Sequence, residues 1–166
     1  MMKLMVCEDN LTPNDVAHLT PRVGVRAVLK HGEQFVIIYY RNWDLYTLPG
    51  GGVEAGESLE TALHRELLEE TGYQVQIVEK TLTLTEYYKD SVWEHHIYLC
   101  ETTSLPKSLA LTELEREAGH EVHYVTYDDL LTVFSNHESP RENAANIYHR
   151  EFLGVIHSLK NEPNRI

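Results

Sequence analysis

Three closely spaced glutamates, Glu66, Glu69 and Glu70, have residue types and a spacing that could do chemistry. They fall in residues 59–71, a stretch that consists mostly of strong helix formers. On a helix that turns about 100° per residue, Glu66 and Glu70 lie inside the apolar arc, which is made by Leu59, Ala62, Leu63 and Leu67. An ordinary amphipathic helix holds its carboxylates on the opposite side. The pattern therefore predicts carboxylates that face inward, with Glu69 at the edge of the arc.

This placement of acid on the inner face has a cost. Glu66 and Glu70 are a like-charge pair at i, i+4, and such a pair is unfavourable by roughly 0.2–0.5 kcal/mol on an exposed helix. Burial adds to the cost because it raises carboxylate pKa values. Arg65 can pair with Glu69 at i, i+4, but one arginine cannot neutralise three carboxylates. A divalent cation could offset the excess negative charge; the alternative interpretation is the solvated face of a glutamate-rich helix.

The ligand types indicate which cation would fit. Carboxylates with no Cys or His in the cluster suit Mg²⁺ or Mn²⁺. Such an ion can polarise a phosphoryl oxygen, lower the pKa of a bound water and hold the attacking and leaving oxygens. Phosphoryl chemistry depends mainly on this positioning and charge neutralisation. The three glutamates therefore predict a metal-dependent reaction at a phosphate.

Turn signals and periodicity predict the elements that must position these glutamates. Ser58 is a good N-cap and Gly72 a good stop for the helix at 59–71. Residues 49–52, Pro-Gly-Gly-Gly, are predicted as a loop because they cannot form an ordinary helix or strand interior. Ser139 followed by a proline predicts a helix that starts at residue 140. Strands are predicted at 23–29, 34–40, 45–48, 75–87, 92–101 and 121–125, a loop with some helix at 104–119, and a helix at 127–134.

The segment from Gly51 to Tyr73 also carries a family resemblance. It reads Gly51, five residues, Glu57, seven residues, and then Arg-Glu-Leu-Leu-Glu-Glu-Thr-Gly-Tyr from residue 65. This resembles the signature box of the Nudix hydrolase family (MutT-like), with Tyr73 where a bulky aliphatic residue is usual. The resemblance implies an α/β fold, a Nudix-like α/β/α sandwich with a mixed β-sheet between helices. It also implies a metal-dependent hydrolase, using Mg²⁺ or Mn²⁺, that cleaves a phosphoanhydride bond in a nucleoside diphosphate linked to another moiety.

The resemblance assigns roles to the box residues by position. Glu69 and Glu70 would be metal ligands, and Glu66 would be a ligand or the general base. Arg65 would orient the carboxylates, and Glu57 would support the loop and helix or join an outer metal site. Gly51, within the loop of residues 50–52, would let the backbone approach the metal and the substrate phosphates.

Residues outside the box are less strongly indicated. A later glutamate is the general base in some family members, and Glu117 is favoured here over the other candidates, which are Glu113, Glu115 and Glu121. Arg26 and Arg41 are candidates for substrate phosphate contact, with surface solvation as the alternative for both. Aromatic residues that could stack on a base, although packing is the better interpretation for each, are Trp43, Tyr87 and Tyr88.

Composition bounds the classes of function. The 166-residue chain carries a net charge of -12, which argues against binding a nucleic-acid backbone but not against a small nucleotide-like substrate. Two cysteines without a metal or disulfide spacing, and no apolar run long enough for a membrane span, favour a cytoplasmic protein without a membrane partner. Residues 1–21 are predicted as an N-terminal arm and 22–166 as a single hydrolase domain. The arm could pair subunits in a homodimer or cap the sheet.

The substrate stays open between a nucleoside triphosphate, a dinucleoside polyphosphate and a nucleotide sugar. Two competing functional classes also stay open. One is a non-catalytic Nudix-like module that senses a nucleotide or binds a partner, although such modules often lose the box glutamates that this chain keeps. The other is a structural cation site without turnover.

Overall fold

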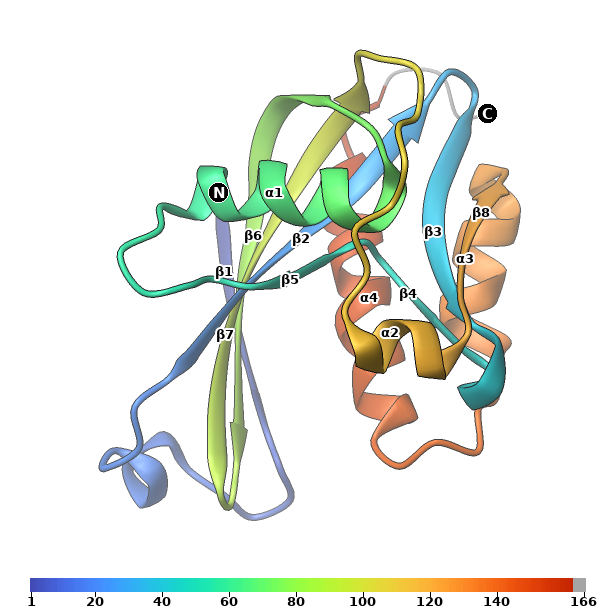
Figure 1. The fold of residues 1–166 in the computed structure, drawn as a ribbon. Helices are drawn as coiled ribbons and strands as arrows, with labels where there is room; N and C mark the ends of the chain where they lie inside the picture. The colour runs from blue at the N-terminus through green and yellow to red at the C-terminus, as the bar shows by residue number, and fades with distance from the viewer. Residues whose placement is uncertain (163–166) are drawn as a thin grey trace.

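The computed structural model describes residues 1–162 and contains one eight-stranded sheet with helices on both faces (Figure 1). Its strands are β1 (Met2–Cys7), β2 (Arg22–His31), β3 (Gln34–Tyr40), β4 (Leu45–Thr47), β5 (Gly50–Gly52), β6 (Val75–Tyr88), β7 (Ser91–Thr102) and β8 (His120–Val125). Its α-helices are α1 (Leu59–Thr71), α2 (Glu113–Ala118), α3 (Tyr127–Asn136) and α4 (Ala144–Leu159), with short 3₁₀ helices at Pro13–Val16 (η1) and Arg41–Trp43 (η2).

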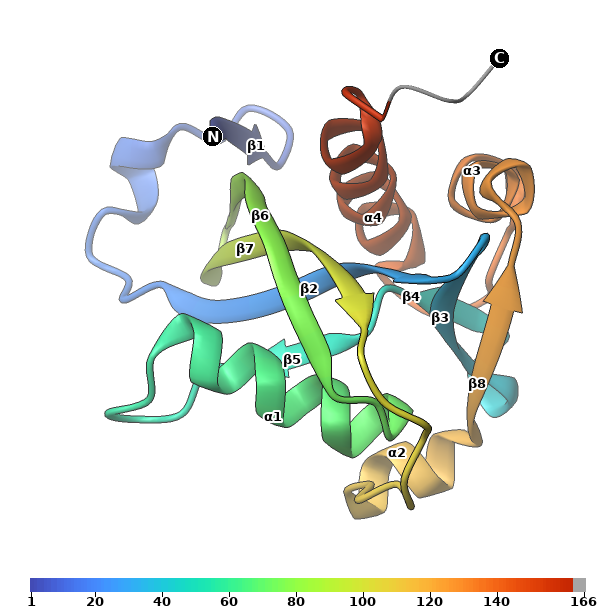
Figure 2. The same cartoon turned by 90° about the horizontal axis from the view of Figure 1, so that it is seen from above.

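The sheet is mixed, as expected. Its main order is β1-β6-β7-β2-β3-β4, and β5 pairs with β2 while β8 pairs with β3. The β1–β6 and β2–β7 pairs are parallel, and the other pairs are antiparallel. Seen from above, α1 covers one face of the sheet and α3 and α4 cover the opposite face (Figure 2). The predicted α/β/α sandwich with a mixed β-sheet is therefore confirmed.

Two apolar clusters hold these layers together. One lies between the sheet and α1 and includes Val25 and Leu29 of β2 with Leu63 and Leu67 of α1. The other lies between the sheet and the α3–α4 layer and includes Val28 of the same strand. The centre of strand β2 is thus buried on both faces, which explains its run of apolar residues at 27–29.

The glycine-rich segment differs from the loop that the sequence predicted. Gly50–Gly52 forms strand β5, which pairs antiparallel with β2, so that Gly50 lies opposite Arg26. Glycine permits this close approach, because a side chain at Gly50 would overlap the backbone of Val25. The backbone at Gly50 also has a φ of 144°, which other residues rarely adopt. The segment therefore remains special in conformation although it belongs to the sheet.

The last helix starts later than the sequence predicted. Helix α4 begins at Ala144 and not at residue 140. The Ser139 hydroxyl donates a hydrogen bond to the backbone carbonyl of Trp43 and accepts one from the Arg141 N–H, so it anchors the loop that precedes the helix. The helix is entered through Asn143, whose φ is 64°. A tertiary contact thus displaced a start signal that is favourable in isolation.

The predicted arm contributes to the fold at its beginning. Residues 2–7 form β1, which pairs with β6 at the edge of the sheet, and residues 13–16 form η1. At the other end, residues 163–166 of the predicted domain lie outside the described residues. No helix within residues 1–162 is long and apolar enough to cross a membrane.

Candidate active site

Helix α1 presents its carboxylates to strand β5. Its start is fixed by the Ser58 hydroxyl, which accepts a hydrogen bond from the Thr61 N–H, and its end by Gly72, whose φ is 78°. The fully buried side chains of Leu63 and Leu67 fix its rotation against the sheet. Both helix ends and the inner face are therefore as the sequence predicted, which directs the glutamates toward the glycine strand.

Glu70 is the most buried carboxylate of this helix, with 3% of its surface exposed. Its Oε2 accepts a hydrogen bond of 2.8 Å from the Gly50 N–H. Burial raises the pKa of Glu70 to about 8, although the charge of Arg26 acts in the opposite direction. Burial also raises the pKa of Glu66, against the lowering effect of Arg65. Glu70 thus lacks enough positive charge to stay fully ionised at neutral pH, and the pKa of Glu66 is shifted in the same direction.

Arg65 forms ion pairs with three carboxylates of this segment. Its Nε and Nη1 lie 2.8 Å from Glu57 Oε1 and Glu66 Oε1, and its Nη1 lies 3.3 Å from Glu69 Oε2. Its Nη2 donates to the Gly52 carbonyl at 3.0 Å. The hydrogen bond from Arg65 lowers the pKa of Glu57 to about 2. One guanidinium thus ties the box helix, the preceding loop and strand β5 together.

Gly51 leaves room for this arrangement. Any side chain at Gly51 would overlap the carboxylate of Glu66, so that the acid lies directly against the backbone of β5. Among residues 1–162, however, no three or more His, Cys, Asp or Glu side chains already form a group that could hold a metal ion. The carboxylates are directed to Arg65 and to Gly50 instead. The donor chemistry still fits a hard divalent cation, because the oxygens outnumber the cations and two of the acids have raised pKa values.

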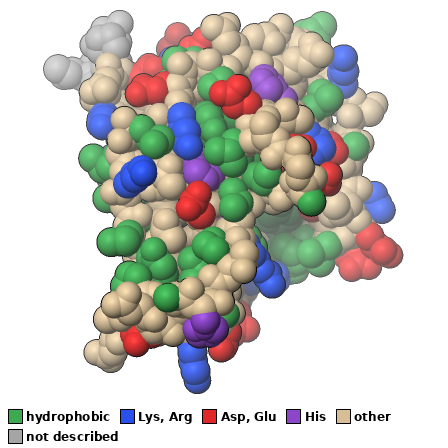
Figure 3. Space-filling model, turned by 90° about the vertical axis from the view of Figure 1, so that its left-hand side faces the viewer, with side chains coloured by type: hydrophobic (Ala, Val, Ile, Leu, Met, Phe, Trp, Pro, Cys, Tyr) green, Lys and Arg blue, Asp and Glu red, His purple; other side chains and the backbone are tan. Residues whose placement is uncertain are grey.

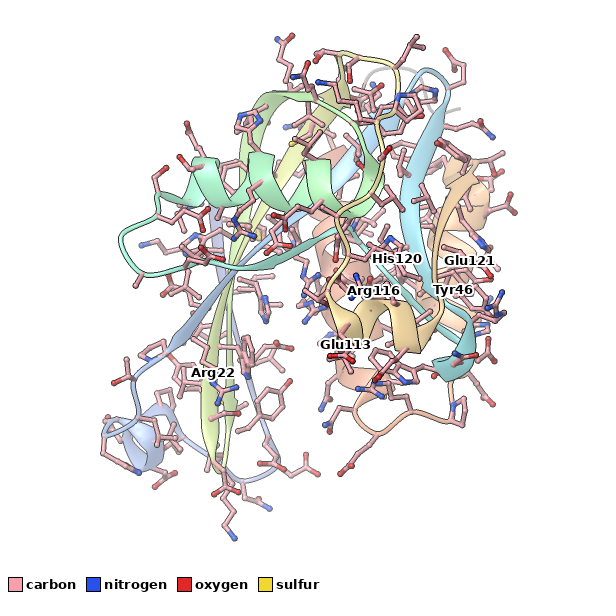
Figure 4. The ribbon with its side chains drawn as sticks, in the orientation of Figure 1. Arg22, Tyr46, Glu113, Arg116, His120 and Glu121 are labelled. Carbon is pink, nitrogen blue, oxygen red and sulfur yellow. The ribbon has the colours of Figure 1, made fainter. Side chains whose placement is uncertain are left out.

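Arg26 lies next to this cluster, whereas Arg41 does not join it. The Arg26 Nη1 donates to the carbonyl of Gly50 at 2.8 Å, on the residue whose N–H binds Glu70. Arg41, at the start of η2, is largely exposed and forms an ion pair of 3.1 Å with Glu121 of β8. Figure 4 shows Glu121 beside β8, on the right of the view and away from helix α1.

The later glutamates lie on or beside α2. Glu117 is exposed, and its backbone carbonyl accepts a hydrogen bond from the Asn42 side chain. Glu115 is half-buried, and its negative charge contributes to the raised pKa of Glu70. Its carboxylate also accepts from the Thr112 N–H and so caps α2. Of the two acids, Glu115 therefore has the closer electrostatic link to the box.

His120 makes a contact that the sequence did not indicate. Its Nε2–H donates a hydrogen bond of 2.8 Å to the backbone carbonyl of Glu70. This bond ties the start of β8 to the end of α1. Nothing in the sequence pattern could have indicated it, because it depends on how two distant elements meet.

A cavity of about 510 Å³ lies beside the box, between the far end of the β6–β7 hairpin and the start of α4. Figure 3 shows a hollow in the molecular surface where two parts of the molecule meet. Arg26 lines the cavity and so connects it to β5. Other residues that line it are Glu86, Tyr88, Trp93, His95 and Arg150. Of the aromatic residues predicted to stack on a base, only Tyr88 lines this cavity.

The cavity wall contains a buried polar network. His95 Nε2 donates to Glu86 Oε2 at 3.0 Å, and the Tyr88 hydroxyl donates to Glu86 Oε1 at 3.0 Å. Burial and the charge of Arg150 lower the pKa of His95 to about 4, so its ring is neutral at pH 7. Within residues 1–162, buried atoms that have no hydrogen-bond partner include Arg26 Nε, His95 Nδ1 and Arg150 Nε. Polar groups around the cavity thus retain unused hydrogen-bonding capacity.

Comparisons with known proteins identify the family and the fold. The model of the NUDIX domain matches residues 20–150. An RNA pyrophosphohydrolase of Dinoroseobacter shibae is 38% identical over 82 residues, which is 48% of this chain and 51% of the relative. The chain thus spans about half the length of that relative.

Solved structures share the fold. A Nudix hydrolase from Nitrosomonas europaea has a TM-score of 0.61 at 18% identity, covering 88% of this chain and 98% of the other. The ORF135 protein of E. coli has a TM-score of 0.57 at 18% identity, covering 90% and 98%. At these identities the likeness shows the fold alone. Together with the family model, which spans most of the chain and includes the whole glutamate box, it shows that this chain belongs to the Nudix hydrolase family.

Proposed function

We propose that this protein hydrolyses a phosphoanhydride bond in a nucleotide-like small molecule, with Mg²⁺ or Mn²⁺ held by the carboxylates of α1. The observation that carries the proposal is the excess of acid against strand β5. Glu70 is almost fully buried with a pKa of about 8, and Glu66 lies against Gly51 with a raised pKa. A divalent cation would relieve both at once.

The carboxylates divide into ligands and supports. Glu66, Glu69 and Glu70 would hold the cation, which supplies neutralisation of phosphate charge when it is bound. Arg65 would keep Glu66 and Glu69 close to β5 until they turn toward the cation. Glu57 would act indirectly, because it is bound to Arg65 and its own pKa is low. The backbone of β5, including Gly51, would let phosphates approach without a side chain in the way.

The general base belongs to one of two places. Glu66 is the candidate within the box, and its raised pKa brings it closer to the operating pH of a base. On α2, Glu117 is the prediction from the sequence, but Glu115 has the stronger electrostatic link to the box. Separate Glu→Gln variants at these three positions would decide, because loss of the base changes the pH profile of kcat.

The cavity beside the box would hold the part of the substrate that carries no phosphate. Its volume, about 510 Å³, falls within the range of small-ligand sites, roughly 300–1,000 Å³. Arg26 contacts β5 and also lines the cavity, so it stands where phosphates and the remaining moiety would join. The unpaired buried atoms of His95 and Arg150 favour a polar moiety, as a nucleoside provides.

The relatives raise a second candidate substrate. Some are named RNA pyrophosphohydrolases, so a triphosphate at an RNA 5′ end has to be tested beside free nucleotides. The net charge of -12 favours the small molecule, because a longer RNA would add phosphates for which the protein offers few cations.

A substrate panel tests the proposal. Purified protein is incubated with nucleoside triphosphates, dinucleoside polyphosphates, nucleotide sugars and triphosphate-ended RNA, with Mg²⁺ or Mn²⁺, and the released phosphates are identified. We expect turnover of at least one small nucleotide. Calorimetric titration with Mn²⁺ adds a readout independent of activity, and Glu70→Gln should weaken binding whereas Glu60→Gln, on the exposed side of the first helical turn, should not.

Two results would overturn it. Nucleotide binding without turnover of any compound would favour the sensing module. An affinity for Mn²⁺ that is unchanged in Glu70→Gln would show that the cation binds at another site.

A further inference from the structure

Strand β1 leads directly to Glu8, which lines the cavity. Strand β1 pairs in parallel with β6 over six residues, from Met2 opposite Leu82 to Cys7 opposite Tyr87. Leu4 and Val6 of this strand pack against the apolar cluster between the sheet and the α3–α4 layer. The segment is therefore held by backbone hydrogen bonds and by apolar contacts. It also precedes residue 20, where the match to the family model begins.

Glu8 extends this pairing to the tip of the β6–β7 hairpin. Its N–H donates to the Tyr87 carbonyl at 2.9 Å, and its Oε2 accepts from the Lys89 N–H at 2.9 Å. The Glu8 carbonyl in turn accepts from the Leu11 N–H, and the turn between them contains Asn10 with a φ of 62°. The backbone of Glu8 is thus held by two hydrogen bonds, and its carboxylate binds the backbone of the hairpin turn.

The hairpin tip has little other support. Strand β2 pairs with β7 only from Trp93 onward, so the preceding residues of the tip extend beyond it. Strand β1 reaches only to Tyr87 on the other side. Within residues 1–162, Glu8 supplies the backbone contact that continues from β1 into the turn.

This turn faces the proposed substrate cavity. Lys89, Asp90 and Ser91 line it together with Glu8 itself, opposite Asn146 and Arg150 of α4. Movement of the turn would therefore widen or narrow the cavity. Helix α1 lies on the opposite face of the sheet from α4 (Figure 2), so such a movement would leave the backbone that carries the box carboxylates in place.

From this geometry we infer that Glu8 is a positioning residue for the substrate: it holds the β6–β7 turn against the nucleoside end of the nucleotide. The inference rests on the proposed function for the identity of the ligand. It predicts that loss of the Glu8 carboxylate weakens substrate binding and leaves the chemical step almost unchanged.

Three variants test the role of Glu8. Glu8→Ala removes the acceptor for the Lys89 N–H, Glu8→Gln keeps an acceptor oxygen without the charge, and Asp9→Ala removes a neighbouring exposed acid as the matched control. The first readout is amide hydrogen exchange at Lys89, which needs no substrate. The second is KM and kcat on the best substrate of the panel, or the dissociation constant if the wild-type protein binds a nucleotide without turnover.

We expect Glu8→Ala to speed exchange at Lys89 and to raise KM roughly 2- to 10-fold, the effect of one lost hydrogen bond, with kcat nearly constant. Glu8→Gln should restore both values, and Asp9→Ala should match the wild type. Unchanged exchange in Glu8→Ala would show that Glu8 does not hold the turn. Faster exchange with unchanged KM would show that the turn does not contact the substrate.

Two further outcomes also overturn the inference. If Glu8→Gln behaves like Glu8→Ala, the charge and not the hydrogen bond carries the effect. If the wild-type protein neither binds nor hydrolyses any nucleotide, the proposed function fails and the substrate role of Glu8 falls with it, whereas the exchange rate still reports whether the turn is held.

Discussion

Buried carboxylates occur on both faces of the sheet, Glu70 on α1 and Glu151 on α4, with 3% and 0% of their surfaces exposed. Glu151 lies in an ion pair with Arg150, the neighbouring residue of the same helix. Glu70 accepts a hydrogen bond from the Gly50 N–H and has no ion pair of its own in the described residues. The two sites therefore bury the same side chain in opposite electrostatic surroundings.

The neighbouring acids repeat the contrast. On the α4 side, burial raises the pKa of Glu86, but the hydrogen bond from His95 and the charge of Arg150 more than offset it, so the pKa ends below its usual value. On the α1 side, burial and nearby acid leave the pKa of Glu70 at about 8. On the α4 side each buried carboxylate thus has a direct partner, Arg150 for Glu151 and His95 for Glu86, whereas Glu70 has no ion-pair partner among the described residues. The absence of a paired cation at Glu70 supports the proposed cation site on α1.

The largest expected effect is loss of activity in Glu70→Gln. The amide keeps an oxygen for the Gly50 N–H but loses the charge that would bind a cation, so kcat/KM should fall at least about 100-fold. Stability without metal should be unchanged or higher, because the amide carries no cost of ionisation in the buried site. Steady-state kinetics and thermal unfolding check both expectations. Glu60→Gln is the control, and full activity of Glu70→Gln would remove the distinction between the two faces.

Glu151→Ala should show the opposite behaviour. It leaves Arg150 buried without its partner, which should reduce the free energy of unfolding by about 3–5 kcal/mol. Urea unfolding measures this loss. The paired replacement of Arg150 by Met and Glu151 by Leu should recover most of it, because neither charge is then left unpaired. A small effect of Glu151→Ala would mean that the buried charge of Arg150 does not depend on its pairing with Glu151.

The sequence predicted the α1 cluster well because it is local. The helix, its caps and its inner face follow from residues within two or three turns of one another, and Arg65 does lie near Glu69 at i, i+4 as expected. The mixed sheet and its two helical layers were also predictable from the strand pattern and the family resemblance. What each site residue does remains a prediction.

Contacts between distant segments could not be predicted in this way. Strand β5 forms because glycine lets it approach β2, and α4 starts late because Ser139 binds Trp43. The α4 network joins residues of β6, β7 and α4, and the sequence pattern of none of these elements marks it. The sequence alone therefore does not indicate that Arg150 and His95 meet at the cavity wall.

The two faces should also respond to pH with opposite signs. Glu70 has a folded pKa of about 8, above its usual 4.5, so the folded state binds the extra proton and stability falls as pH rises from about 4.5 to 8. His95 has a folded pKa of about 4, below its usual 6.5, so the unfolded state binds the extra proton and stability falls as pH drops from about 6.5 to 4.

Thermal unfolding across this range, without metal, separates the two effects. Glu70→Gln should flatten the alkaline decline, and His95→Gln should flatten the acid decline. Added Mg²⁺ should raise the melting temperature of the wild type most near pH 8, because it favours the ionised carboxylate. A wild-type alkaline decline that Glu70→Gln leaves intact would contradict the assignment of the charge shortage to α1.

The smallest expected effect belongs to Arg41→Ala. Arg41 is 66% exposed in its ion pair with Glu121, and exposed pairs contribute about 0–1 kcal/mol to stability. Both stability and KM should therefore change little, in contrast to Arg26→Lys, which disturbs the contact with Gly50 and should raise KM. Kinetics on both variants with one nucleotide make the comparison. A large rise in KM for Arg41→Ala alone would mean that Arg41 leaves Glu121 to bind phosphate. Arg41 would then add to the positive charge available on the α1 side of the sheet.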